Sequence, residues 1–77
     1  MKRLKDIEIV FDTEYYNERK KQLGFLDKDV EVLTGLSIDL LSKYKCHHAV
    51  PKAENLYKIA MALEVTMEDL LKEIHHE

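Results

Sequence analysis

The chain is interrupted at very few points. It contains only two glycines and one proline among its 77 residues, and these residue types are the strongest breakers of regular structure. Gly24 and Gly35 can each end a helix, because glycine readily takes the left-handed conformation that helix C-termini favour. Pro51 suits the first turn of a helix, where its missing N–H costs nothing. The sequence therefore predicts a few regular elements that are divided near these three positions.

Apolar periodicity predicts five helices between these breaks. The fourth is the clearest, because its inward residues recur at the spacing of one helix face: Leu56, Ile59, Ala60 and Leu63. The fifth begins with Thr66 and Asp69, a pair with capping-box spacing. Its core-facing residues are Leu70, Leu71 and Ile74. The predicted helices cover residues 13–23, 27–34, 37–44, 51–63 and about 66–74.

Residues 7–11 are the only strand candidate in the sequence. Ile7, Ile9 and Phe11 share one face of an extended chain, and β-branched residues favour a strand. A lone strand cannot satisfy its own backbone hydrogen bonds. It would therefore pair with its copy in a second subunit, pack as an arm, or remain an extended leader. The predicted fold class is all-α, with an arm or strand at residues 1–12 before a five-helix domain at residues 13–77.

The charge is distributed unevenly along the chain. The formal net charge is −3, yet residues 37–52 sum to +2 with neutral histidines, and residues 53–77 sum to −4. Overall acidity argues against a protein that simply coats nucleic acid. The mildly basic middle nevertheless leaves room for a local DNA contact.

The connection between the second and third helices has the pattern of a helix-turn-helix. Gly35 permits the positive φ of a tight turn, and Leu36 would fill the crevice between the helices. Ser37 caps the third helix, so that its N-terminal end can project into a major groove.

The surrounding sequence resembles the lambda-repressor/Cro (Xre) family of helix-turn-helix domains over roughly residues 14–73. The resemblance is carried by residues 30–37, 41–44 and 50–51, and above all by 56–71, with an Ile-Ala-x-Ala-Leu-x-Val core and an Asp-Leu-Leu ending. It implies a small transcriptional regulator that binds duplex operator DNA as a homodimer. The chain departs from the usual family pattern at four positions, which are Asp27 (usually Gln), Glu31 (usually a small residue), Lys45 (usually Glu) and His47 (usually Gly).

The resemblance also implies which residues would contact DNA. The third helix would read base edges, with Lys43 as its strongest donor, while the other residues would hold the phosphate backbone. The implicated residues are Lys20, Lys28, Ser37, Ile38, Asp39, Ser42, Lys43, Lys45, His47 and His48. The homodimer would use either the strand or the C-terminal helix, through Ile7, Ile9, Phe11, Leu71 and Ile74.

A protein-binding adaptor or inhibitor on the same fold is the alternative. Asp27 and Asp39 would be repelled by a phosphate backbone, and Ile38 with Leu40 could anchor a protein partner instead of reading bases. The same third-helix surface would then serve a different class of partner.

Other chemistry is not indicated by the sequence. Adjacent histidines at 47–48 and 75–76 lack chelate spacing, and neither a phosphate-binding glycine loop nor a catalytic triad pattern occurs. The chain has no run of about 18 apolar residues and no apolar stretch after its start of the kind a signal peptide needs. A single cysteine, Cys46, cannot form an internal disulfide. We therefore expect a cytoplasmic protein that is not an enzyme, with no cofactor, metal or membrane contact.

Overall fold

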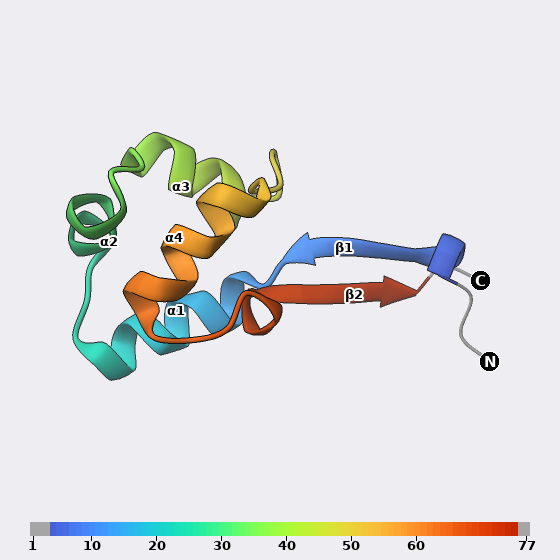
Figure 1. The fold of residues 1–77 in the computed structure, drawn as a ribbon, viewed down its shortest axis with the longest axis horizontal. Coiled ribbons are helices and arrows are strands. Elements are labelled where there is room, and N and C mark those ends of the chain that lie inside the picture. The colour runs from blue at the N-terminus through green and yellow to red at the C-terminus, as the bar shows by residue number, and fades with distance from the viewer. Residues whose placement is uncertain (1–3, 76–77) are drawn as a thin grey trace.

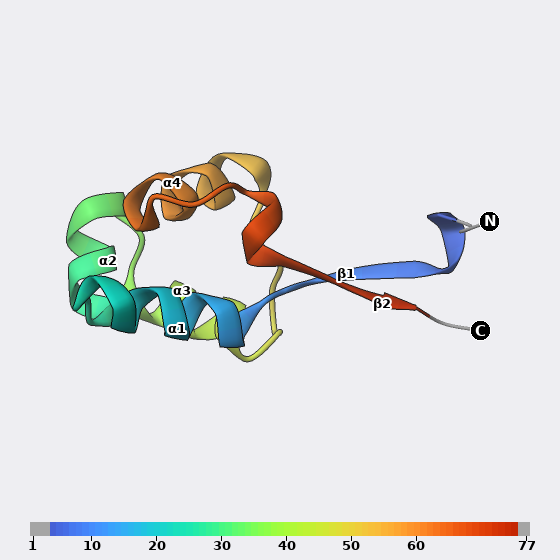
Figure 2. The ribbon, with the colours of Figure 1, turned by 90° about the horizontal axis from the view of Figure 1, so that it is seen from below.

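The computed structural model describes residues 4–75. Over these residues the chain forms four α-helices and two β-strands, in the order β1 (Ile7–Phe11), α1 (Thr13–Leu23), α2 (Asp27–Thr34), α3 (Ile38–Lys45), α4 (Ala53–Leu63) and β2 (Leu71–His75). One-turn 3-10 helices, η1 (Leu4–Asp6) and η2 (Glu68–Leu70), precede the two strands. Helices α1 and α3 lie on one side of α4, and α2 closes the end farthest from the strands (Figure 1, Figure 2).

The first four predicted helices are confirmed to within a few residues, because local signals define their ends. The Asp12 carboxylate accepts a hydrogen bond of 3.1 Å from the Tyr15 N–H at the start of α1. The Ser37 hydroxyl oxygen does the same for the Leu40 N–H of α3, also at 3.1 Å. Gly24 and Gly35 end α1 and α2 with φ of 73° and 76°. Helix α4 begins at Ala53, two residues later than Pro51 suggested.

The predicted fifth helix is wrong, and with it the all-α fold class. Thr66 and Asp69 do form the reciprocal capping bonds, each 3.1 Å long, but the helix lasts only one 3-10 turn. From Leu71 onward the chain is extended and pairs antiparallel with β1, so that Phe11 lies opposite Leu71 and Ile7 opposite His75. The protein is therefore a small mixed α/β fold with four helices and a two-stranded sheet over its described residues.

The hydrogen-bonding needs of β1 explain this difference. A helix of about eight residues has little stability of its own, whereas an extended segment satisfies the backbone groups of a strand that would otherwise have no partner. Leu70 is buried in the core, and the chain runs from it directly into the strand that pairs with β1. The partner of β1 is thus β2 of the same chain, so residues 7–11 form neither a free arm nor an extended leader.

The two strands form a ribbon that projects from the helices. They run side by side away from the helical body (Figure 1, Figure 2), and the molecule measures 41 Å along its longest axis against 22 and 19 Å across it. Phe11 connects the ribbon to the body, because it is only 1% exposed and its ring lies 5.4 Å from that of Tyr16 and 6.2 Å from that of Tyr44, between centroids. The buried core consists of Phe11, Tyr16, Val30, Leu36, Leu41, Tyr44, Leu56, Ile59, Ala60, Leu63 and Leu70.

Candidate nucleic-acid interface

Helix α3 has one buried and one outward face. Leu41 and Tyr44 are buried, and Leu40 packs against the core from its edge. The opposite face carries residues of the predicted reading surface: Ser37, Ile38, Asp39 and Lys43 are exposed, and Ser42 is partly exposed. Of the predicted apolar pair, Ile38 is 36% exposed, whereas Leu40 is only partly exposed because it packs against the core.

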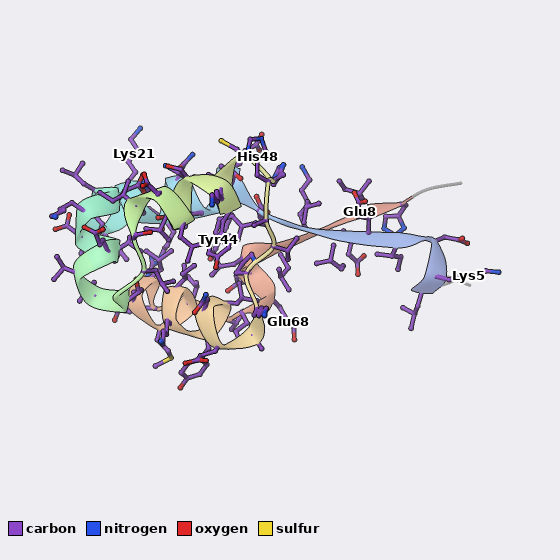
Figure 3. The ribbon with its side chains drawn as sticks, turned by 90° about the horizontal axis from the view of Figure 1, so that it is seen from above. Lys5, Glu8, Lys21, Tyr44, His48 and Glu68 are labelled. Atoms are coloured by element: carbon purple, nitrogen blue, oxygen red, sulfur yellow. The ribbon has the colours of Figure 1, made fainter. Side chains whose placement is uncertain are left out.

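Cationic side chains surround this face. Lys28 of α2 has a side chain that is 69% exposed, and His48 is exposed in the loop that follows α3. Figure 3 shows Lys21 and His48 projecting from the same side of the helical body, with Glu68 on the opposite side. Lys21 is absent from the predicted contacts, because the sequence does not indicate which of the consecutive lysines of α1 faces outward.

The N-terminus of α3 holds a carboxylate from the same chain. The Glu31 side chain accepts a hydrogen bond of 3.1 Å from the Ile38 N–H and forms an ion pair of 3.1 Å with Lys28. The hydrogen bond from Lys28, followed by that from the Ile38 N–H, lowers the pKa of Glu31. A negative charge therefore occupies the end of the helix that would otherwise be most attractive to a phosphate.

Two of the predicted phosphate contacts are engaged within the protein. The carboxylate of Asp27, at the start of α2, accepts hydrogen bonds from Lys20 of α1 and Lys45 of α3. It also accepts the Tyr16 hydroxyl at 3.0 Å, and the Lys20 ammonium lies 4.7 Å from the centroid of the Tyr16 ring. Lys20 and Lys45, both predicted to hold the DNA backbone, therefore join α1 and α3 to α2 through Asp27 in this structure.

The ionisation of this cluster follows from its contacts. Partial burial by itself would raise the pKa of Asp27, but hydrogen bonds from Lys20, Lys45 and Tyr16 outweigh it and lower the pKa to about 2. Burial, together with the neighbouring charge of Asp27, raises the pKa of the Tyr16 hydroxyl well above its ordinary value. Two of the departures from the family pattern, Asp27 and Lys45, thus contact one another.

His47 has a structural role in the loop. It takes a left-handed conformation with φ of 62°, at the position where the resembling family usually has glycine. Its Nε2 lies 2.9 Å from the Phe11 carbonyl oxygen, to which it donates, and the Thr13 hydroxyl donates to the Lys45 carbonyl oxygen at 2.8 Å. His47, for which a phosphate contact was predicted, therefore ties the end of α3 to the junction between β1 and α1.

Arg19 is likewise engaged in the fold. Its Nε donates a 2.8 Å hydrogen bond to the Leu63 carbonyl oxygen, which lies at the C-terminal end of α4, where cationic side chains are favourable. Around the outward face of α3, the described cations that remain for an external partner are then Lys21, Lys28 and Lys43, with His48 beside them.

The predicted dimer residues are divided between surface and core. Phe11 is buried and cannot form an intermolecular surface, and Ile7 and Leu71 are partly buried. Ile9 and Ile74 remain 41% and 37% exposed. They belong to the two strands of the ribbon, because no C-terminal helix forms at Leu71–His75.

The described residues include neither a metal-binding cluster nor a membrane-spanning helix. Within 4–75, no three His, Cys, Asp or Glu side chains are grouped so that they could hold a metal ion. Nor does any helix in that range have the length and apolar character needed to cross a bilayer. Cys46 is an exposed free thiol, and His75 lies 3.4 Å from Glu73. Its sequence neighbour His76 is outside the described residues.

A scan against protein-family models, a search of curated proteins and a search of solved structures found no match to this chain.

Proposed function

We propose that the protein is a small DNA-binding transcriptional regulator, of the lambda-repressor/Cro type that its sequence resembles, and that α2 and α3 act as its helix-turn-helix. The observation that carries this proposal is the outward face of α3, which none of the other described elements covers and which Lys21, Lys28 and His48 flank. Such a function would place the protein in the cytoplasm.

In this proposal α3 lies in the major groove. Lys43 is the one outward cation of α3, because Lys45 is bound to Asp27, and it would contact a guanine edge or a phosphate. Ser42 adds a hydroxyl, and Ile38 offers apolar contact to a thymine methyl group. Lys21 and Lys28 would contact the phosphate backbone on either side.

Salt titration on duplex DNA tests the proposal. Three lysine–phosphate contacts per bound copy predict a log–log slope of about −3, since each neutralised phosphate contributes about −0.9. Binding would be measured on random and on selected duplexes by fluorescence anisotropy. Undetectable binding to every duplex at low salt would overturn the proposal.

The substitution Lys43→Ala identifies the surface that binds. If Lys43 reads a guanine, its loss costs about 1–3 kcal/mol of specific binding free energy. Lys58→Ala is the matched control, because Lys58 lies on α4 and pairs there with Glu54. Equal losses for the two variants would place DNA elsewhere on the molecule.

Glu31 limits DNA affinity in this proposal. Glu31→Gln retains an oxygen that can accept the Ile38 N–H but removes the negative charge and releases Lys28. We expect tighter binding, because a negative charge is removed beside the phosphates, with a salt slope still near −3, because Lys28 is already one of the three contacts. Glu54→Gln, on exposed Glu54 of α4, should leave both quantities unchanged.

A protein-binding module is the second candidate function, and exposed apolar residues of α2 favour it. Val32 and Leu33 are exposed, together with Ile38 at the start of α3, and the carboxylates of Glu31 and Asp39 lie beside them in the fold. Ile38→Lys separates the two functions. If α3 contacts DNA, the added cation strengthens DNA binding. If neither the unaltered chain nor the variant binds DNA, a protein partner is favoured.

A further inference from the structure

The backbone of β1 has one edge that β2 does not use. Just beyond the paired strands, the Asp12 N–H donates to the Leu70 carbonyl oxygen at 2.8 Å. Because hydrogen-bonded pairs alternate along an antiparallel ladder, Glu8 and Val10 direct their backbone groups toward β2. Those of Ile7, Ile9 and Phe11 point to the other side.

Only the outer part of this edge is available. The Phe11 carbonyl oxygen receives the His47 side chain, which closes the inner end beside the helices. The sheet has two strands, in the order β1–β2, among the described residues, so no third strand covers Ile7 and Ile9. An isolated two-stranded sheet is marginally stable in water, and an open edge is a template for another strand.

We propose that the β1 edge at Ile7 and Ile9 pairs antiparallel with the same edge of a second copy of this chain. The result is a four-stranded intermolecular sheet, in the order β2–β1–β1–β2, with a two-fold axis between the two Ile9 residues. This inference does not depend on DNA binding.

Charge and the occupied Phe11 carbonyl oxygen together favour this register among the symmetric ones. With the axis at Ile9, Glu8 lies opposite Val10 of the second copy, and no like charges are opposed within Ile7–Phe11. Ile7 then lies opposite Phe11, so the pair of hydrogen bonds between the two Ile9 residues is the centre of the contact. Asp6 and Asp12 are opposed only beyond the strand ends, where the Asp12 carboxylate caps α1. An axis at Glu8 would oppose two glutamates, and an axis at Val10 would place Phe11, whose carbonyl oxygen His47 occupies, in every hydrogen-bonded pair. Like charges placed directly opposite destabilise a sheet.

The same register brings opposite charges together across the new sheet. Lys72 lies opposite Val10 in the ribbon, and Glu8 of the second copy would lie on the other side of Val10, on the same face. The two side chains are then separated by two strand spacings, about 9.5 Å, which lysine and glutamate can bridge. This complementarity arises twice, by symmetry.

The net negative charge of the ribbon favours a second copy of the chain over DNA as its partner. Lys5 and Lys72 are outnumbered by Asp6, Glu8 and Glu73, so the ribbon would be repelled by a phosphate backbone. Ile9, at 41% exposure, supplies the apolar contact at the axis.

Sedimentation equilibrium over a range of protein concentrations tests the pairing, without DNA. We expect the unaltered chain to approach twice its monomer mass and Ile9→Lys to remain monomeric, because two lysines would face each other at the axis. Ile74→Lys is the matched control. Within the ribbon Ile9 lies opposite Glu73 and Ile74 lies opposite Glu8. A lysine introduced at either position therefore faces a glutamate of its own chain and should be equally tolerated there. A monomeric unaltered chain, a dimeric Ile9→Lys, or a monomeric Ile74→Lys would overturn the proposal.

Disulfide cross-linking tests the register. In a background of Cys46→Ser, Ile9→Cys would place two thiols at a hydrogen-bonded pair with Cα atoms about 5.5 Å apart, within the range that a disulfide spans. We expect a covalent dimer for Ile9→Cys and none for Val10→Cys, whose equivalent positions are offset along the strands. Cross-linking of Val10→Cys as readily as Ile9→Cys would contradict the register.

Discussion

The carboxylate of Asp27 joins three helices through its contacts with Tyr16, Lys20 and Lys45. Both lysines have side chains with little exposed surface, 12% for Lys20 and 22% for Lys45. Because all three donors converge on one group, removing its charge would leave two partly buried ammonium groups without their shared acceptor. The orientation of α2 and α3, and so the shape of the candidate DNA-binding face, depends on this residue.

We therefore expect Asp27→Asn to destabilise the protein. The free energy of unfolding should fall by about 1–3 kcal/mol, the range for losing hydrogen bonds to a charged group, as measured by urea denaturation. Asp39→Asn is the control, because Asp39 is exposed on α3 and its replacement should change stability by less than about 0.5 kcal/mol. Equal effects of the two substitutions would show that the Asp27 cluster adds nothing to stability.

The lowered pKa of Asp27 predicts a pH dependence. Its pKa falls from the ordinary value of 3.8 to about 2 in the folded protein, so the stabilisation is complete above about pH 4 and is lost as the pH falls toward 2. The stability difference between the unaltered chain and Asp27→Asn should shrink over that interval. Urea midpoints for both proteins at several pH values would measure it, and a constant difference would contradict this account.

The turn between α2 and α3 sets the relation between these two elements. Gly35 takes φ of 76°, and a Cβ at this position would meet nothing within 4 Å. A substitution there is therefore strained by its backbone conformation and not by a clash. His47 and Glu64 also have positive φ, so the left-handed conformation occurs in this chain even without glycine.

We expect Gly35→Ala to lower the free energy of unfolding by about 1–2 kcal/mol, the cost of a left-handed non-glycine residue. Gly35→Asn should cost less, because asparagine tolerates this conformation better. Thermal and urea unfolding would compare the two. An alanine variant as stable as the original would mean that the turn relaxes to a different φ.

At the scale of the whole molecule, the ribbon and the helical body differ in stability. The core residues belong mainly to the body, and of the ribbon only Phe11 is buried among them. Local opening free energies follow the amount of buried apolar contact. The ribbon should therefore open more readily than the helices that surround Ile59 and Leu63.

Hydrogen exchange would show this difference and its dependence on concentration. We expect the Ile9 amide to exchange quickly in dilute protein and to gain protection as the concentration rises, because pairing with a second copy uses its N–H. The Ile59 and Leu63 amides in α4 should be slow throughout. A dimer in which the Ile9 amide remains unprotected would mean that the copies meet on another surface.

The four helices were predictable from the sequence because the signals that define them are local. Asp12 and Ser37 cap the helices they precede, Gly24 and Gly35 end helices, and the spacing of Leu56, Ile59 and Leu63 shows a buried face. The outward face of α3 was predictable for the same reason, since helical periodicity separates it from the buried Leu41 and Tyr44.

What only the tertiary structure decided involves partners far apart in the chain. The periodicity of residues 70–74 suits a helix, yet Leu71–His75 forms a strand because β1, some sixty residues earlier, needs its backbone hydrogen bonds. In the sequence, nothing indicates that Lys20 and Lys45 are paired. In the fold, α1 and α3 place both ammonium groups beside the Asp27 carboxylate. The sequence by itself determined the positions of the four helices α1 to α4, since their caps and periodicity act within a few residues. The ribbon and the loss of two cations from the candidate interface depend on contacts that exist only once the chain has folded.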